Sequence, residues 1–250
     1  MAAPLAVAAV AVVGVLIAYR ARRPRAARAD DDANKPRLPR SAGDVPLATS
    51  AAEAASAIRA EGVCLLSGVV DAATARELYE RLQAIQPRKL QNRRQHRWEH
   101  VHSPEAPPLA ELAALPVVVE LVRALLGPKT YLEKAGLLVS HHGAEPQRWH
   151  MDTPHLFACG THLPPHSLSV FVPLVDLTPA NGPTEFQLGT HVRANLVAKQ
   201  RRAHAACPVG SLVAYDPRLM HRGGPNQSHA ERPMVYLTFS RVWYRDTLNP

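Results

Sequence analysis

His150 and Asp152 are separated by one residue, and together with the distant His221 they form a set of side chains that can hold a metal ion. In a β-strand, side chains two positions apart point to the same face, so we expect His150 and Asp152 to reach one ion from one side. Two imidazoles and one carboxylate on one face of an octahedral ion leave three positions open, which suits non-heme Fe(II) beside a chelating cosubstrate. Arg232 would supply the cation for the far carboxylate of that cosubstrate.

The His-x-Asp triplet is a weak signal by itself. The chain has 13 histidines and 21 acidic residues, so a polar pair on a surface strand is the alternative interpretation. The sequence around His221 adds to the signal, because strand-like segments at 210–216 and 232–242 are separated by turns at 217–219 and 223–225. This pattern predicts two adjacent strands joined by a short loop that carries His221.

Four stretches follow one another in a characteristic order: Trp149–Asp152, Val172–Asp176 with Asn181–Pro183, His221–Ser228, and Arg232. In these stretches the span from about Gly136 to Tyr244 resembles the phytanoyl-CoA dioxygenase family of Fe(II)/2-oxoglutarate oxygenases. The resemblance implies that three residues hold the Fe(II): His150, Asp152 and His221. It also implies that the far carboxylate of 2-oxoglutarate is bound by Arg232, eleven positions after the last ligand, with help from Ser228.

Phe171 corresponds in this resemblance to an aromatic residue that lines the cosubstrate pocket; ordinary core packing is the alternative. The implied reaction hydroxylates an organic substrate with molecular oxygen and converts 2-oxoglutarate to succinate and carbon dioxide, with ascorbate a candidate reductant. Related halogenases lack the carboxylate ligand, so Asp152 favours hydroxylation. The expected substrate is a small molecule or a lipid, with an acyl-CoA among the candidates.

Two functions from other classes stay open. One is a non-catalytic, membrane-anchored jelly-roll binding protein, although a binding role alone would not need His150, Asp152, His221 and Arg232 together. The other is a cupin-like jelly roll that holds a different metal, although cupin sites commonly take more histidines from the first motif.

The N-terminal residues 2–19 are apolar and uncharged. At about 1.5 Å per residue a helix of this length spans roughly 27 Å, close to the ~30 Å core of a bilayer. Five arginines follow within residues 20–28, which favours a single-pass membrane anchor with the following domain facing the cytoplasm. A cleaved signal peptide and an organelle-targeting peptide are the alternatives.

This arginine flank also contributes much of the formal net charge of +8. No nucleic-acid-binding motif accompanies the charge, so we expect an anionic membrane surface and not a nucleic acid as its partner. The domain organisation predicted from these features is an anchor at 1–19, a basic flank and linker at 20–44, and an oxygenase domain at 45–250.

The fold class predicted for residues 45–250 is mainly β with flanking helices, built around a double-stranded β-helix, or jelly roll. Helices are expected at about 50–60, 71–85 and 116–126, where Ser50, Asp71 and Pro116 give starting signals. Strands are expected at 62–67, 131–140, 167–175, 184–188, 210–215 and 232–242, because short apolar runs alternate there with Pro-, Gly- and Asn-rich turns.

The charged run at 88–100 is expected to form a solvated face, or else an entrance loop that meets an anionic substrate. Five further histidines, at 141, 142, 155, 162 and 166, crowd the sequence near the His-x-Asp pair and are expected mostly in loops or on the surface. Three widely spaced cysteines, Cys64, Cys159 and Cys207, give no disulfide framework and no zinc spacing, as is typical of a reducing compartment.

Overall fold

The computed structural model describes residues 43–247 apart from 94–95, 158–161 and 193–200. The predicted anchor at 1–19 and nearly all of the predicted flank and linker lie outside the described residues. Within the described ranges, no helix has the length and apolar composition needed to cross a membrane.

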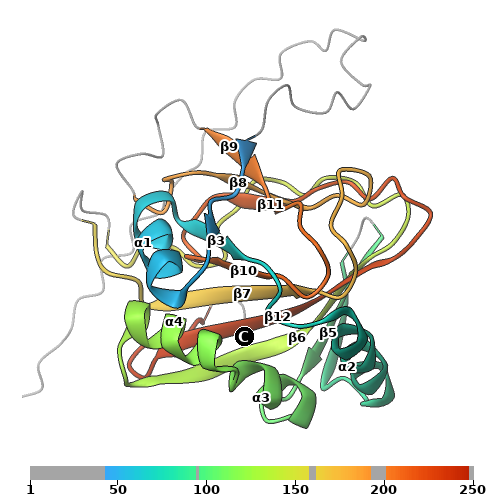
Figure 1. The fold of residues 1–250 in the computed structure, drawn as a ribbon, viewed down its shortest axis with the longest axis horizontal. Coiled ribbons are helices and arrows are strands. Elements are labelled where there is room, and N and C mark those ends of the chain that lie inside the picture. The colour runs from blue at the N-terminus through green and yellow to red at the C-terminus, as the bar shows by residue number, and fades with distance from the viewer. Residues whose placement is uncertain (1–42, 94–95, 158–161, 193–200, 248–250) are drawn as a thin grey trace, which may run out of the picture. The chain divides into compact units, whose positions relative to one another are not determined.

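Two β-sheets form the centre of the described fold (Figure 1). The larger has eight strands in the order β2 (Leu47–Ala48), β3 (Val63–Leu66), β10 (Leu212–Tyr215), β7 (Ser167–Pro173), β12 (Arg232–Arg241), β6 (Thr130–Ser140), β5 (Arg97–His102) and β4 (Lys89–Arg93). The smaller has four, in the order β1 (Gly43–Asp44), β9 (Arg202–His204), β8 (Thr184–Gln187) and β11 (His221–Gly223). The predicted mainly-β class with a jelly-roll core is confirmed.

One apolar cluster lies between the two sheets. Phe171 and Val213 of the larger sheet belong to the same buried cluster as Phe186 and Ala203 of the smaller one. Because side chains alternate across a strand, the neighbours of these residues in the larger sheet face the opposite side. The larger sheet is therefore buried on both faces.

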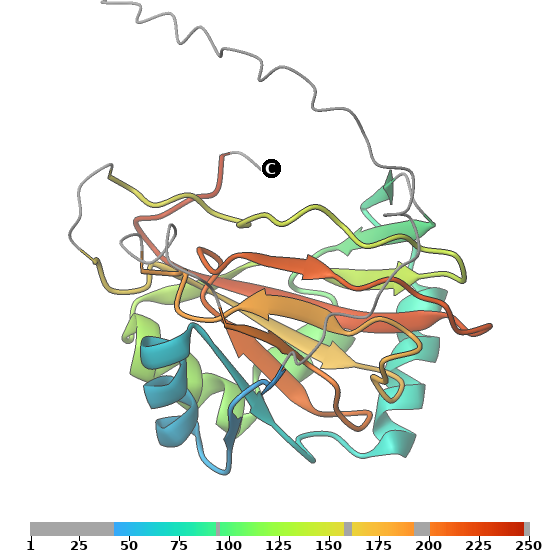
Figure 2. The same cartoon turned by 90° about the horizontal axis from the view of Figure 1, so that it is seen from above.

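Four helices cover the second face of the larger sheet: α1 (Ala51–Glu61), α2 (Ala72–Ala84), α3 (Pro107–Ala113) and α4 (Pro116–Leu126). Figure 2 shows these helices on one side of the strands. The predicted capping residues Ser50 and Asp71 accept hydrogen bonds from the backbone N–H groups of Glu53 and Thr74. The helix α3 was not expected from the sequence.

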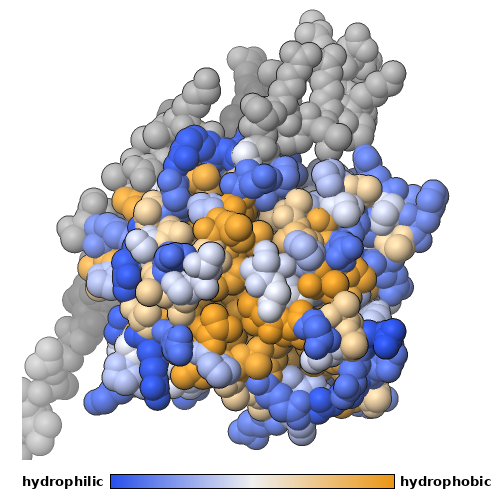
Figure 3. Space-filling view, viewed as in Figure 1, coloured by the Kyte–Doolittle hydropathy of each residue, from blue (hydrophilic) through white to orange (hydrophobic). Residues whose placement is uncertain are grey.

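Apolar side chains reach the surface on the helical side. Figure 3 shows them gathered in the middle of this face, between α1 and α2. Val69, Ile85 and Val209 are among the partly exposed residues that pack against the core beneath the helices. The helices therefore cover this face of the sheet incompletely.

The strands β10 and β12 are not adjacent, so the prediction of two neighbouring strands joined by a short loop was wrong. β7 lies between them, because Phe171 is in register with Val213 on one side and with Tyr236 on the other. The intervening β11 pairs with β8 in the smaller sheet. The chain thus leaves the larger sheet after β10 and returns on the far side of β7.

Candidate metal centre

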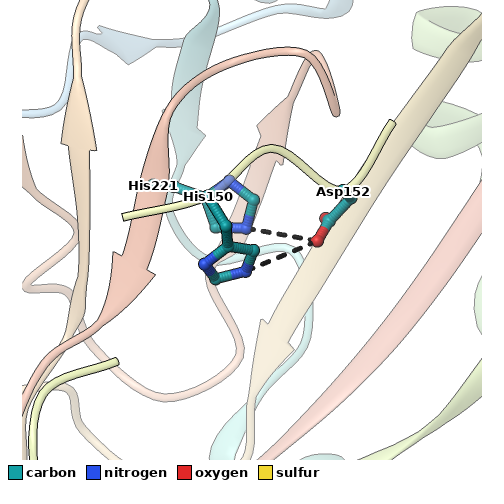
Figure 4. Close-up of side chains that lie close together, drawn as sticks. All are labelled: His150, Asp152 and His221. Atoms are coloured by element: carbon teal, nitrogen blue, oxygen red, sulfur yellow. Dashed lines mark ion pairs between the residues drawn. The ribbon is translucent and has the colours of Figure 1, made fainter. Parts of the chain in front are cut away.

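The predicted ligands His150, Asp152 and His221 lie together, with His221 on β11 and the other two in the segment between β6 and β7 (Figure 4). Asp152 Oδ1 is 3.7 Å from His150 Nε2 and 3.5 Å from His221 Nε2. One ligand atom from each of the three residues lies within 4.8 Å of the others. Across the ranges that the structure describes, no other group of three histidine, cysteine or acidic side chains comes this close together.

His150 and Asp152 do not lie on a continuous strand, so the prediction that a strand aligns them was wrong. His150 forms an isolated bridge to His221, in which each backbone N–H donates to the other residue's carbonyl, at 3.0 and 2.9 Å. The backbone N–H of Asp152 donates to the carbonyl of Pro217 at 2.9 Å. These bonds to the His221 segment bring the pair and the distal histidine together in place of a regular ladder.

Both histidines present the same ring nitrogen to the centre. His150 Nδ1 is 2.8 Å from the carbonyl oxygen of Arg148, and His221 Nδ1 is 2.9 Å from that of Leu219. A carbonyl oxygen only accepts, so each Nδ1 carries a proton. Each Nε2 is then available as a metal ligand, an arrangement typical of metal-binding histidines.

The acid and the buried base of the centre stabilise one another's charged forms. Burial acts to raise the pKa of Asp152, but the charges of His221 and His150 outweigh it and hold the pKa below its usual range. Burial acts to lower the pKa of His221, but the Asp152 carboxylate outweighs it and raises the pKa. A metal cation can take the place of the His221 proton as partner of the carboxylate.

Arg232 begins β12 and is 4 % exposed. Its Nε and Nη1 atoms are buried without a hydrogen-bond partner among the described residues. Burial, together with the charge of the neighbouring Arg97, lowers the pKa of Arg232 to about 9. A buried guanidinium with unsatisfied donors fits an anionic ligand such as a carboxylate.

Arg97 is a second buried arginine, and its place in the site was not predicted from the sequence. The run at 88–100, predicted as a solvated face or an entrance loop, instead forms β4 and β5 as a hairpin paired to β6. Arg97 is 6 % exposed and donates to Ser140 Oγ at 3.1 Å, to the Glu145 carbonyl at 2.8 Å and to the Gly224 carbonyl at 2.6 Å. The buried positions Arg97 and Glu99 of β5 are polar, so the sequence shows no apolar alternation that would indicate a strand.

A cavity of about 210 Å³ connects the three candidate ligands with the two arginines. Phe171 lines it, and its ring centroid is 5.1 Å from that of Tyr215, so the residue serves the cavity wall and the packing at once. The cavity wall also carries several other polar groups: Glu99, Glu133, Lys134, Ser169, Thr238 and Asp246.

Ser228 does not belong to the lining of this cavity. Its hydroxyl donates to Asn226 Oδ1 at 2.7 Å and to the Ala230 carbonyl at 3.1 Å, within its own loop. Its assistance to the cosubstrate stays a prediction. The five further histidines also lie outside the lining, but His166 is 1 % exposed and not a surface residue.

Residues 58–234 match the family Phytanoyl-CoA dioxygenase (PhyH). The chain belongs to the phytanoyl-CoA dioxygenase family. The match covers most of the chain and includes all three candidate ligands and Arg232. Membership makes this chain an enzyme of the Fe(II)/2-oxoglutarate-dependent oxygenase type, and the donor set and the unsatisfied Arg232 fit that pair of cofactors.

Solved structures of similar fold include oxygenase-type proteins. The non-heme alpha-ketoglutarate-dependent epimerase SnoN from nogalamycin biosynthesis is 19% identical with a TM-score of 0.63, over 76% of this chain and 83% of SnoN. EctD from S. alaskensis, with 2-oxoglutarate and 5-hydroxyectoine, is 21% identical with a TM-score of 0.64, over 76% of each chain. HygX from Streptomyces hygroscopicus, with nickel and 2-oxoglutarate, is 14% identical with a TM-score of 0.64, over 77% of this chain and 87% of HygX.

Proposed function

We propose that this enzyme hydroxylates an organic substrate in a reaction that consumes 2-oxoglutarate and molecular oxygen and releases succinate and carbon dioxide. The observation that carries the proposal is the group of His150, Asp152 and His221 in one cavity with the unsatisfied guanidinium of Arg232. The bound Fe(II) and cosubstrate supply the oxidising chemistry.

The roles of the chain's own residues follow from their positions. His150, Asp152 and His221 hold the metal, with each histidine oriented by a backbone carbonyl. Arg232 binds the far carboxylate of 2-oxoglutarate in a charge-assisted contact. Phe171, 8 % exposed, keeps water from the cosubstrate side of the cavity.

The test is succinate formation from 2-oxoglutarate by the purified full-length protein with Fe(II) and ascorbate. Wild type should turn over slowly without added substrate, His221→Ala should lose this turnover, and Arg232→Ala should need far more 2-oxoglutarate. His162→Ala, which changes an exposed histidine outside the cavity, should match wild type. If the wild type shows no turnover and binds neither iron nor 2-oxoglutarate, the result would favour the non-catalytic binding protein instead.

For the substrate, we propose a small molecule with polar groups, and keep a lipid or acyl-CoA as the alternative. The cavity of about 210 Å³ lies below the ~300–1,000 Å³ typical of sites for drug-sized ligands, and it also has to hold the cosubstrate. Beyond the metal ligands its wall carries Glu133, Lys134 and Asp246, which suit hydroxyl or amino groups better than a fatty chain. This choice would be supported if hydroxylated or amino compounds accelerate the consumption of 2-oxoglutarate and fatty acids or acyl-CoAs do not.

We further propose that the apolar residues 2–19 anchor the enzyme in a membrane, with the oxygenase domain from residue 45 facing the cytoplasm. Deletion of residues 1–19 should release the protein from alkali-washed membranes, and protease added to sealed membrane vesicles should report the side on which the domain lies. An N-terminus shortened in the mature protein would favour the organelle-targeting alternative.

A further inference from the structure

The two oxygens of the Asp152 carboxylate have different surroundings. Oδ1 faces the Nε2 atoms of His150 and His221, at 3.7 and 3.5 Å, and the dashed lines in Figure 4 join one Asp152 oxygen to both rings. Oδ2 accepts a hydrogen bond from the Tyr215 hydroxyl at 2.8 Å. One oxygen is therefore turned toward the metal position, and the other is held by a phenol.

The packing around Tyr215 fixes its hydroxyl in this place. Tyr215 ends β10 and is 1 % exposed. Its ring centroid is 5.1 Å from that of Phe171, 5.4 Å from that of Phe186 and 4.8 Å from that of His221. A ring enclosed on three sides cannot swing its hydroxyl away without displacing core residues or a candidate ligand.

The number of carboxylate oxygens that bind the metal decides how many positions remain for other ligands. Three single-atom protein ligands leave three positions on an octahedral ion, of which a chelating 2-oxoglutarate takes two. A carboxylate that bound through both oxygens would take one of these three positions. A hydrogen bond to the second oxygen stabilises binding through one oxygen, since rotation of the carboxylate toward the metal would break that bond.

We propose that Tyr215 is a positioning residue that holds Asp152 as a one-oxygen ligand and so keeps the sixth metal position open beside the chelating cosubstrate. The inference concerns the metal centre on which the proposed function also rests. It assigns to Tyr215 a role that the strand pattern at 210–215 does not indicate, because only the folded chain brings the hydroxyl to the carboxylate.

The test compares metal-free full-length wild type with Tyr215→Phe, which keeps the ring and removes the hydroxyl. Co(II) is titrated into each protein, and its visible absorption reports both affinity and coordination number. We expect the dissociation constant for Co(II) to rise at least tenfold in Tyr215→Phe, within the 10- to 100-fold range typical for loss of a group that orients a metal ligand. We also expect a changed absorption intensity, because binding of the second Asp152 oxygen changes the coordination number of Co(II).

Tyr131→Phe is the matched control. The Tyr131 hydroxyl donates to the Tyr244 carbonyl at 2.9 Å, and the residue lies outside the cavity lining, so its removal should leave Co(II) affinity unchanged. The melting temperature of each metal-free protein shows whether a loss of affinity comes from unfolding. A second variant with 3-fluorotyrosine at position 215, a stronger hydrogen-bond donor, keeps the test open if Tyr215→Phe is unstable, and it should retain wild-type affinity and spectrum.

The outcomes separate this inference from the proposed function. If the wild type binds no Co(II), the metal centre itself is wrong and the proposed function fails with it. If the wild type binds Co(II) and Tyr215→Phe binds with an affinity within twofold and an identical spectrum, only the role of Tyr215 is overturned. If the fluorotyrosine variant shows the same altered Co(II) affinity and spectrum as Tyr215→Phe, the packing of the ring matters and the hydroxyl does not.

Discussion

The buried guanidinium of Arg232, beside a second buried arginine at one end of the cavity, requires a counter-charge. Arg232 and Arg97 are 4 % and 6 % exposed, and the charge of Arg97 contributes to the lowered pKa of Arg232. Burying a charge without a partner costs several kcal/mol in typical proteins. Binding of a dicarboxylate cosubstrate would offset part of that cost, so recognition and stability are coupled at Arg232.

Replacing Arg232 with Gln should therefore act in opposite directions on binding and on the ligand-free protein. Loss of a buried partner typically costs about 2–5 kcal/mol, so the dissociation constant for 2-oxoglutarate should rise roughly 30-fold to several-thousand-fold. The ligand-free variant should melt no lower than wild type, because the unpaired charge is gone. Calorimetric titration of metal-loaded protein and thermal unfolding check the two effects.

Arg222→Gln is the control for this prediction. Arg222 pairs with Glu185 at 2.8 Å and lies outside the cavity lining, so its loss should not change 2-oxoglutarate affinity. Equal 2-oxoglutarate affinity in Arg232→Gln and Arg222→Gln would contradict the assignment of Arg232 as the cosubstrate's cation.

Asp152→Ala removes the one carboxylate among the candidate ligands. Hydroxylation should be abolished, since the two remaining histidines hold the metal weakly and the charge that balances it is lost. Succinate formation checks this outcome. Once a substrate is known, mass spectrometry of the hydroxylated product checks it directly. A rate equal to that of the wild type would remove Asp152 from the ligand set.

At the scale of helices and strands, the sequence predicts those elements whose start and end depend on neighbouring residues. The helices that begin after Ser50, after Asp71 and at Pro116 were predicted from capping signals within one turn. The strands β6, β7, β8, β10 and β12 were predicted from apolar runs bounded by turns. In both cases a few neighbouring residues decide the outcome.

Pairing between distant segments was predicted less well. β5 was missed because Arg97 and Glu99 face the cavity, so its inward positions are polar and an apolar alternation is absent. The neighbours of β12 were wrong because β7, far earlier in the chain, lies between β10 and β12. For the same reason residue types and spacing indicated His150, Asp152, His221 and Arg232, whereas Arg97 and Tyr215 emerge only from contacts across strands.

Gly136 shows how closely the strands around the cavity approach one another. A Cβ atom at this position of β6 would lie 2.3 Å from the His100 carbonyl oxygen of β5 and 2.7 Å from the Tyr236 ring of β12. Gly136→Ala should therefore lower the free energy of unfolding by about 3 kcal/mol, as measured by chemical denaturation. Gly43→Ala, with no atom within 4 Å of the added Cβ, should stay within about 0.5 kcal/mol of wild type, and equal losses in both variants would contradict the steric argument.

At the scale of the described fold, segments far apart in the sequence complete the cavity. The segment after β12 returns to β6, where Asp246 pairs with Lys134 at 2.8 Å and its backbone N–H donates to Glu133 at 2.8 Å. These residues form the polar end of the cavity, opposite the two arginines. The two ends of the cavity are therefore lined by opposite ends of β6 and β12, with Arg97 of β5 at one end and the segment after β12 at the other.

The stability of the enzyme in acid should depend on His166, a buried histidine outside the cavity. Burial, with a contribution from the charge of Arg218, lowers the pKa of His166 to about 4. In the unfolded chain a histidine titrates near 6.5, so unfolding takes up a proton between these two pH values. The stability contributed by neutral His166 is therefore complete above about pH 6.5 and falls as the pH drops toward 4, by about 3 kcal/mol in total.

His166→Phe removes this proton uptake without removing a hydrogen bond. Neither ring nitrogen of His166 has a partner among the described residues, and its ring lies 4.2 Å from that of Tyr244, a contact that phenylalanine can keep. Urea denaturation at pH 8 and pH 5 should show similar free energies of unfolding for the two proteins at pH 8. At pH 5 the variant should be more stable by about 2 kcal/mol. If the difference in stability between the two proteins is the same at both pH values, the prediction is contradicted. The pKa of His166 would then not be lowered in the folded protein.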